Sequence, residues 1–582
     1  MPTTTIRTCV PATLNGADWS AIEPIIQDLS TRTVATVGEY EQWLIDRSEL
    51  DAACMEARAN LYIASSCDTE DKAKGEAFAA FIEHVGPRLE TAGFELDKKQ
   101  VTLSDNFRLS PARYGVLDRN VRAGVELFRA ENVPIQTELE KLSQQFGKVA
   151  GAQTVKFAGV EQTLPRMAAY QQDTDRTVRE AAWRAVVVRR LQDRDTLNEL
   201  YTQMITRRDR LARNAGCASF VEFAFKDKRR FDYTPTDCEK FWNAAAKHVV
   251  PLMKRLDAKR QRTLGVPALR PWDLGVDTHG RPGLKPFDGG RDLFDKTACV
   301  FDALDGRLGG LFRRLGAGES ASDGKTLVSE YLDLDSRKGK RPGGYQYNRA
   351  RSRKPFIFMN AAGLHRDVMT MVHEGGHAFH SMLCEHDVLV EYRGSPTEFA
   401  EVASMSMEHL TMPHWGVPGG YYTGEEELNR ARAEHLEHAI TILAWIAAID
   451  SFQHWIYRNP AHTPAQRDDQ WIVIDDRFGH QVSWEGLTDE RRSRWQQQSH
   501  LFSHPMYYIE YGIAQLGALS LWLKSRTGGE SAAVDAYVRA LTLGASKPLP
   551  ELFAAAGLSF EFGEGPIARI CEEVEAELSR LG

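Results

Sequence analysis

The sequence predicts a mainly α-helical protein with two large lobes and a small β-sheet. Apolar and charged residues alternate at helical spacing over most of the chain, and runs of strand-forming residues are few and short. With 582 residues, the chain exceeds what one hydrophobic core usually serves, so we expect two lobes whose segments can interleave. A composition of 42% hydrophobic and 26% charged residues excludes a disordered chain, a collagen and a coiled-coil rod.

Charge and cysteine content narrow the class of protein further. Lys and Arg number 72 against 80 Asp and Glu, and the net charge of −8 argues against a dedicated nucleic-acid binder. The first ten residues lack the apolar run of a signal peptide, and no stretch approaches the ~18 consecutive apolar residues of a membrane span. The eight cysteines are scattered without a C-x-x-C pair, so we expect reduced thiols, neither a disulfide framework nor a cysteine-based zinc site. These features predict a cytoplasmic protein.

The N-terminal third of the chain reads as helix followed by a hairpin. Helical spacing covers residues 17–100 and 119–150. Thr154–Phe157 and Val160–Leu164 then flank an Ala-Gly pair, which is typical of two antiparallel strands. We therefore expect an N-terminal helical lobe over residues 1–170 that ends in this hairpin.

The middle of the chain combines loops with three expected strands. Helical spacing resumes over residues 175–213, and Gly/Pro-rich stretches at 265–291 and 316–344 indicate loops. The expected strands are Tyr331–Asp335, Gly344–Tyr347 and Pro355–Met359. From Asp367 onward the spacing is helical again, so the strands would form a small sheet within a helical region.

The strongest chemical signal is the run His-Glu-Gly-Gly-His within Val372–Ala378. His373 and His377 are four positions apart, so on a helix they share one face and can both bind one Zn²⁺. Glu374 can reach a metal-bound water without itself binding the metal, and can act as the general base. In a chain of this composition the five-residue pattern is expected by chance about 0.03 times.

The two glycines inside this motif carry a separate expectation. Gly375 and Gly376 each cost ~1 kcal/mol of helix stability relative to alanine. Their presence predicts that another part of the molecule approaches the helix backbone closely.

Spacing alone leaves the third metal ligand open. Position 383, where a metzincin carries histidine, is Leu383, and His380 lies too far along the helix, so we interpret it as a core histidine or a support for a ligand. Glu398, Glu401 and Glu408 fall near one face of the next expected helix. A buried carboxylate there needs a charged partner, which zinc would supply.

Three segments closely resemble the oligoendopeptidase F branch of the thimet-oligopeptidase family: Lys354–Asn360, Asp367–His380 and Glu398–Glu408. The resemblance implies a zincin-like metallopeptidase, with two helical lobes around a deep channel and a small β-sheet beside the active-site helix. It implies that Glu401 is the third zinc ligand and that Glu408 orients a ligand imidazole. Glu398 is then structural or faces the substrate.

A second cluster, within residues 494–515, contains histidines and tyrosines. Donors beyond the metal lower the barrier of water attack, because the carbonyl oxygen becomes an oxyanion. The family resemblance implies that His500, Tyr508 and Tyr511 stabilise this oxyanion or align substrate. His504 and Tyr507 remain alternatives, because the register around Pro505 is open. Taken alone, the tyrosines would read as core aromatics.

The strand at Pro355–Asn360 directly precedes the motif helix. Such a strand can bind an extended peptide along its edge, or it can pack beneath the helix.

The resemblance thus implies a zinc-dependent endopeptidase that hydrolyses internal bonds of short unstructured oligopeptides. One Zn²⁺ per chain would be held by His373, His377 and Glu401, within a catalytic region at residues 171–582. We expect peptides as partners, no nucleic acid and no membrane, and leave monomer or homodimer open. The alternatives are a carboxypeptidase or dipeptidyl carboxypeptidase with the same zinc site, or a non-catalytic peptide-binding protein that contains zinc.

Overall fold

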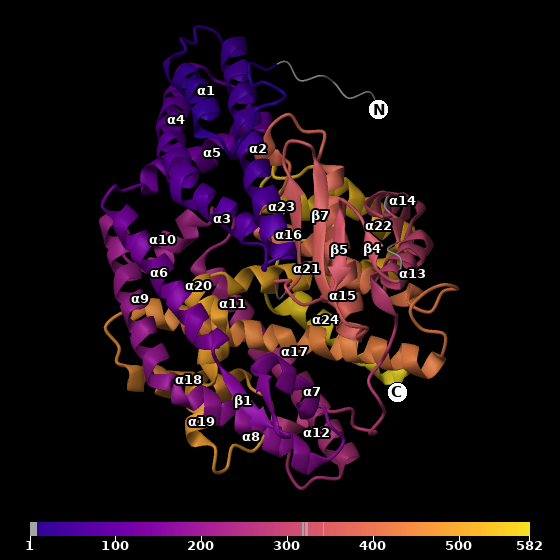
Figure 1. The fold of residues 1–582 in the computed structure, drawn as a ribbon. Helices are drawn as coiled ribbons and strands as arrows, with labels where there is room; N and C mark the ends of the chain where they lie inside the picture. The colour runs from indigo at the N-terminus through magenta and orange to yellow at the C-terminus, as the bar shows by residue number, and fades with distance from the viewer. Residues whose placement is uncertain (1–7, 317–318, 321–323, 342) are drawn as a thin grey trace. The chain divides into compact units, whose positions relative to one another are not determined.

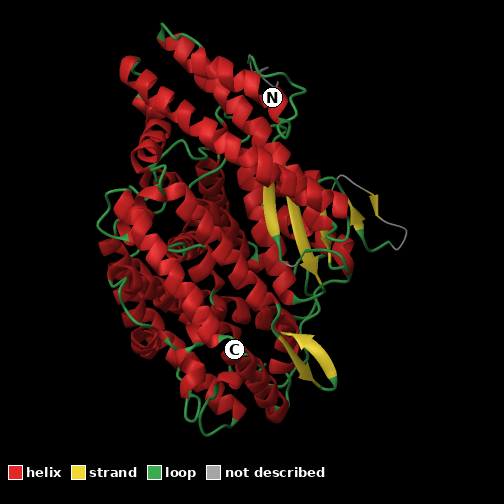
Figure 2. Ribbon diagram, turned by 60° about the vertical axis from the view of Figure 1, so that its left-hand side comes forward, coloured by secondary structure: helices red, strands yellow, loops and turns green. Residues whose placement is uncertain are grey.

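The computed structural model of the chain describes residues 8–582, with the exception of 317–318, 321–323 and 342. Residues 1–7, on which part of the expectation about a signal peptide rests, lie outside the described residues. Helices dominate the described part, and the strands are few and short (Figures 1 and 2). The prediction of a mainly helical protein with a small sheet is confirmed.

The chain forms two compact units, and each is assembled from three separated segments. Unit 1 comprises Met1–Glu126, Leu284–Arg432 and Gly517–Phe560, and unit 2 comprises Leu127–Gly283, Ala433–Leu516 and Glu561–Gly582. The expected boundary near residue 170 falls inside unit 2. The division into an N-terminal lobe and a catalytic region, and the channel implied by the family resemblance, stay predictions.

Unit 1 contains the motif helix, α15, and the three-stranded sheet. Its helices are α1 (Trp19–Thr31), α2 (Val37–Cys67), α3 (Lys72–Ala80), α4 (Gly86–Asn106), α5 (Pro111–Leu127), α13 (Gly289–Leu304), α14 (Gly306–Leu315), α15 (His365–Leu383), α16 (Thr397–Leu410), α22 (Glu530–Leu541) and α23 (Leu549–Ala555). Two further helices, α17 (Glu425–Arg458) and α21 (Tyr508–Gly528), are divided between the units, and the last residue of α5, Leu127, is the first of unit 2.

The three strands lie close to their predicted positions: β5 (Leu332–Asp335), β6 (Tyr345–Arg349) and β7 (Lys354–Ala361). β7 is central, parallel to β5 and antiparallel to β6. The possibility that the strand at Pro355–Asn360 offers an edge to a peptide is therefore wrong, because both sides of it are paired. A short ladder of β3 (Glu319–Ser320) with β4 (Leu327–Val328) was not expected.

β7 is buried on both faces, which explains its continuous apolar run. Phe356 and Phe358 pack with Ile63 of α2, and the Phe358 ring stacks on that of Tyr345 at 4.8 Å between centroids. α15 packs against β7 (Figure 1). Since side chains alternate along a strand, Ile357 lies on the face opposite Phe356 and Phe358. The sheet is therefore a support beneath the motif helix.

The start of α15 is set by Asp367 in its first turn. The buried Asp367 carboxylate accepts hydrogen bonds from the backbone N–H groups of Leu364 at 3.0 Å and Ala362 at 2.8 Å. These donors precede the first helical turn and would otherwise lack partners in the interior. The position of the motif along the helix is thereby tied to the end of β7.

Unit 2 contains the predicted hairpin, formed by β1 (Thr154–Phe157) and β2 (Val160–Thr163), with Thr154 opposite Thr163. Its helices are α6 (Asn132–Gly151), α7 (Met167–Gln171), α8 (Arg176–Gln192), α9 (Arg194–Asn214), α10 (Phe220–Asp227), α11 (Pro235–Ala244), α12 (Val250–Leu264), α18 (Pro464–Phe478), α19 (Thr488–Arg492), α20 (Ser499–Ser503) and α24 (Glu564–Leu581).

α17 is long and apolar enough, by length and composition, to cross a membrane. In the protein, 72% of its most apolar window is buried. A helix that packs its apolar residues inside the molecule in this way is typical of a protein core.

Candidate active site

The motif glycines allow two helices of unit 1 to cross closely. A Cβ placed on Gly376 would lie 2.5 Å from the carbonyl oxygen of Ala403 and 2.6 Å from the Cα of Ser404, both in α16. A Cβ on Gly375 would meet the Phe301 ring at 3.1 Å. The expectation that another segment approaches the α15 backbone is confirmed, and the segment is the helix that carries Glu401.

Close crossing brings His373, His377 and Glu401 together; we call them the open cluster. One donor atom from each lies within 4.8 Å of the others. The Glu401 Oε2 atom is 3.4 Å from His373 Nε2 and 3.6 Å from His377 Nε2. Two donors bound tetrahedrally to Zn²⁺ at about 2.0–2.1 Å lie roughly 3.3–3.4 Å apart. The donor set and its spacing therefore fit a zinc ion.

Glu408 supports this cluster from a position two turns further along α16 than Glu401. Its Oε1 lies 2.7 Å from Nδ1 of His373, so the imidazole donates from Nδ1 and leaves the Nε2 lone pair for the open cluster. Ser404 Oγ donates to Glu401 Oε2 at 3.1 Å. These contacts hold two of the three donor groups in orientation.

Glu374 directly follows His373 of the open cluster in the sequence. Its Oε2 is buried and has no hydrogen-bond partner among the described residues. Burial raises the pKa of Glu374 to about 7. The charge of His373 lowers this pKa, and the charge of Glu401 raises it. A carboxyl group with a pKa near neutrality can take up and release a proton, as general-base chemistry requires.

The electrostatics of the cluster favour a cation. Burial lowers the pKa of His377 to about 4. Burial disfavours the charged form of His373 too, but its contacts with Glu401 and Glu408 outweigh this and hold its pKa well above the usual value. Burial raises the pKa of Glu401, yet the two histidines bring it down to about 2. The carboxylates thus stabilise positive charge at this position, whether a proton or a metal ion supplies it.

His380 and Glu398, whose roles the sequence left undecided, are both buried in the interior. His380 is buried against Phe399, with ring centroids 6.4 Å apart, and burial lowers its pKa to about 3. It is a core histidine. Glu398 is 4% exposed. Of the three glutamates on α16, Glu401 is the one whose oxygen meets both motif histidines.

The predicted histidine–tyrosine cluster forms within unit 2. The His500 ring centroid lies 5.2 Å from that of Tyr508 and 5.9 Å from that of Tyr511. The alternatives, His504 and Tyr507, join the same cluster at 6.1 Å and 6.0 Å from His500. The role of these residues opposite the metal stays a prediction, since the open cluster belongs to unit 1.

Gln498 organises this cluster and was missed in the sequence. Its Oε1 accepts hydrogen bonds from Trp445 Nε1 and from the Tyr508 hydroxyl, both at 3.0 Å. Because the indole N–H is only a donor, Oε1 must face it, and Nε2 must face His500 Nδ1 at 2.7 Å. His500 Nδ1 is therefore an acceptor, and the ring proton sits on Nε2. A glutamine two residues before a histidine carries no recognisable signal in a sequence.

Comparison with known proteins places the chain in a family. The chain matches the sequence profile of peptidase family M3 over residues 169–278 and 320–569. It is 25% identical to oligopeptidase PepF of Bacillus subtilis (strain 168) over 345 residues, which are 58% of this chain and 47% of the relative. It is 32% identical to the chromosomal oligoendopeptidase F of Lactococcus lactis subsp. cremoris over 80 residues, 14% of this chain and 13% of the relative.

A solved structure extends the similarity to the whole chain. PZ peptidase A, determined with an inhibitor, shares 25% identity with this chain at a TM-score of 0.84, over 99% of each chain. The alignments to the two curated relatives span less than half of those proteins.

Proposed function

The chain belongs to peptidase family M3, and on that premise we propose that it is a zinc-dependent endopeptidase that cleaves internal bonds of short, unstructured oligopeptides. The observation that carries the proposal is the meeting of His373, His377 and Glu401 within 4.8 Å, beside a Glu374 oxygen that has no partner among the described residues. The names of the relatives, an oligopeptidase and an oligoendopeptidase, support the same substrate class.

Zn²⁺ would be held by His373, His377 and Glu401, one ion for this site. Bound there, it supplies a Lewis acid that lowers the pKa of a water molecule and polarises the scissile carbonyl. Glu408 keeps the proton of His373 on Nδ1 and so keeps Nε2 available as a ligand.

Glu374 acts as the general base. Its unpartnered Oε2 would accept a proton from the attacking water and deliver it to the leaving amine, so that one carboxyl group serves both steps.

His500, Tyr508 and Tyr511 would stabilise the oxyanion or align the peptide. His500 carries its proton on Nε2, as its contact with Gln498 requires, and can donate it to a developing negative charge. Tyr508 already donates to Gln498 at 3.0 Å, so its hydroxyl supports a positioning role more than a direct one.

The edge strand β6 is the better candidate for peptide pairing, since β7 is enclosed. Burial has the largest effect on the pKa of Glu374 and raises it. The backbone N–H of Gln346, in β6, donates a hydrogen bond to the Glu374 carboxylate and acts in the opposite direction. The Gln346 side chain donates to Ser381 Oγ of α15 at 3.2 Å. A peptide that extended the sheet at this strand would run close to the general base.

A cytoplasmic location belongs to the proposal as well. All eight cysteines are described, and none forms a disulfide. This agrees with a reducing compartment.

Mass spectrometry of cleaved peptides tests the proposal. Zinc-loaded protein and a series of unstructured peptides of increasing length, with free or amidated C-termini, would be incubated and the products mapped. We expect cleavage at internal bonds that is insensitive to amidation and absent from folded proteins. Release of one or two residues only from free C-termini would replace the endopeptidase with a carboxypeptidase or dipeptidyl carboxypeptidase, and the absence of all cleavage would leave a peptide-binding protein.

A further inference from the structure

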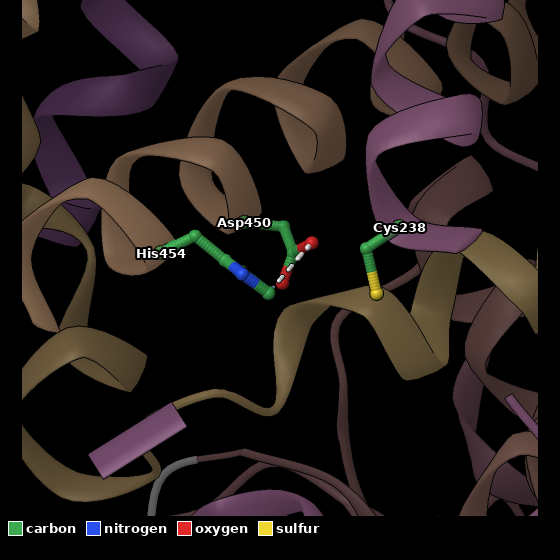
Figure 3. Close-up of side chains that lie close together, drawn as sticks. All are labelled: Cys238, Asp450 and His454. Carbon is green, nitrogen blue, oxygen red and sulfur yellow. Dashed lines mark ion pairs between the residues drawn. The ribbon is translucent and has the colours of Figure 1, made fainter. Parts of the chain in front are cut away.

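A second group of potential metal ligands lies in the interior of unit 2. Cys238 of α11 faces Asp450 and His454 of α17, and one ligand atom from each lies within 4.8 Å of the others (Figure 3). Asp450 and His454 are four positions apart, so they share one face of the helix, as His373 and His377 do. We call these three residues the closed cluster.

The closed cluster is buried and its polar atoms are short of partners. Cys238 and Asp450 are 0% exposed and His454 is 1% exposed. Asp450 Oδ2 accepts a hydrogen bond from Trp242 Nε1 at 2.8 Å, but Asp450 Oδ1 and both ring nitrogens of His454 have no hydrogen-bond partner among the described residues. The 3.8 Å between His454 Nε2 and Asp450 Oδ2 is too long for a hydrogen bond. Buried polar atoms are normally paired, so these atoms need an explanation.

The ring of His454 is fixed by its surroundings. It meets the Trp242 ring edge-to-face at 4.9 Å and the Phe225 ring at 6.2 Å between centroids. Aromatic walls offer no hydrogen bonds to a nitrogen in the ring plane. They instead hold the imidazole in place with its nitrogens unused.

Charge balance in this interior suits a divalent cation. A thiolate and a carboxylate around one divalent ion would form a neutral assembly, which avoids burying uncompensated charge. The two neighbouring cations are already paired: Arg230 contacts the Glu510 carboxylate at 2.6 Å, and Arg458 contacts that of Glu239 at 2.8 Å.

We propose that Cys238, Asp450 and His454 bind a second Zn²⁺, which joins α11 to α17 and has a structural role. Sulfur, imidazole nitrogen and carboxylate oxygen are all established zinc ligands, and thiolate disfavours Mg²⁺ and Ca²⁺. Asp450 would contribute a carboxylate oxygen, and the hydrogen bond from Trp242 Nε1 would hold that carboxylate in orientation. Zinc would displace the thiol proton of Cys238, and a water molecule would complete four-fold coordination.

Metal counting tests this site separately from the proposed active site. In a His373→Ala/His377→Ala variant, which lacks the open cluster, we expect one zinc per chain by elemental analysis of the folded protein. Adding Cys238→Ala should reduce this to none. Adding Cys571→Ala, which removes another buried cysteine of unit 2, should leave one.

Cobalt substitution gives a readout in the wild-type protein that variants then assign to one cysteine. The open cluster contains no sulfur, so a thiolate-to-Co²⁺ charge-transfer band in the near ultraviolet must come from a cysteine. We expect this band in the Co²⁺-loaded wild type and in the Cys571→Ala variant, and its loss in the Cys238→Ala variant.

The proposal is overturned if the His373→Ala/His377→Ala variant holds no zinc and Co²⁺-loaded wild type shows no such band. Either result is compatible with full peptidase activity, so failure here does not bear on the proposed function.

Discussion

The open and closed clusters use the same spacing of ligands in opposite surroundings. Each pairs two residues four apart on a helix with a third from a neighbouring helix, and each brings its donors within 4.8 Å. The side chains of the open cluster are 13–23% exposed, whereas Asp450 and His454 of the closed cluster are 0–1% exposed. Ligand spacing therefore predicts that a metal can bind, and access decides what the metal can do.

The residues around the two clusters also differ: carboxylates lie near the open cluster, and aromatic rings surround the closed one. Glu408 holds a ligand of the open cluster in orientation, and Glu374 adds an oxygen with no partner among the described residues. The closed cluster is surrounded by Trp242 and Phe225, which offer no proton acceptor to a reaction. Only the open cluster combines partly exposed ligands with a neighbouring carboxylate that can act as the base in hydrolysis.

The largest expected effect is on the base. Glu374→Gln keeps the shape of the side chain but cannot take a proton, so we expect kcat to fall ~10²–10⁴-fold. Zinc content should stay as in the wild type. Steady-state hydrolysis and elemental analysis would show this, with the exposed Glu427→Gln as a control of unchanged activity. Full activity of Glu374→Gln would show that the open cluster does not owe its activity to this base, and would contradict the comparison with the closed cluster.

The second-largest effect on kcat is expected at His500 and at Gln498, which holds the His500 ring. His500→Ala should lower kcat ~10²–10³-fold, as loss of an oxyanion donor does elsewhere. Gln498→Leu should lower it less, because it releases the His500 ring without removing it. Since Gln498 acts through His500, the double variant should be no slower than His500→Ala. Additive losses in this cycle would show that Gln498 has a separate role.

Glu408→Gln tests whether the carboxylate behind His373 raises the zinc affinity of the open cluster. A glutamine can still contact His373 but carries no charge, so we expect zinc binding to weaken ~10–100-fold. Competition with a chromophoric chelator measures this. An unchanged affinity would mean that the 2.7 Å contact has no part in holding the ligand.

The smallest expected effect concerns the helix crossing beneath the open cluster. Gly376→Ala forces a methyl group against the backbone of Ala403, and overpacking of this kind costs ~1–3 kcal/mol. Gly310→Ala, on an exposed face of α14 with nothing near its Cβ position, should instead stabilise the protein by ~0.4–1 kcal/mol. Urea unfolding followed by circular dichroism compares the two. Equal stability of the two variants would contradict the close crossing.

The sequence predicted those features that depend on local spacing. His373 and His377 show their shared face within five residues, and the three strands near the motif are recognisable from their apolar runs. The choice of Glu401 among three glutamates rested on family resemblance, because the angle at which α16 crosses α15 is a tertiary property. The order of the strands was missed for the same reason: nothing local indicates that β7 pairs on both sides.

Features assembled from distant segments were beyond the sequence. Gln498 acquires its role from Trp445, on another helix. Cys238 reads as an isolated thiol until α11 packs beside Asp450 and His454. The early expectation of no cysteine-based zinc site followed from the absence of local cysteine pairs, and it is this expectation that the closed cluster challenges.

The central claim is that hydrolysis depends on a metal ion held by His373, His377 and Glu401. The most direct test is to dialyse the protein against a zinc chelator, titrate zinc back, and follow peptide hydrolysis at each step. We predict that activity disappears when the open cluster loses its ion and returns fully when zinc is restored there, whereas a Glu401→Ala variant recovers none at the same zinc concentration. Full activity without metal in the open cluster, or recovery of Glu401→Ala in step with the wild type, would contradict the account.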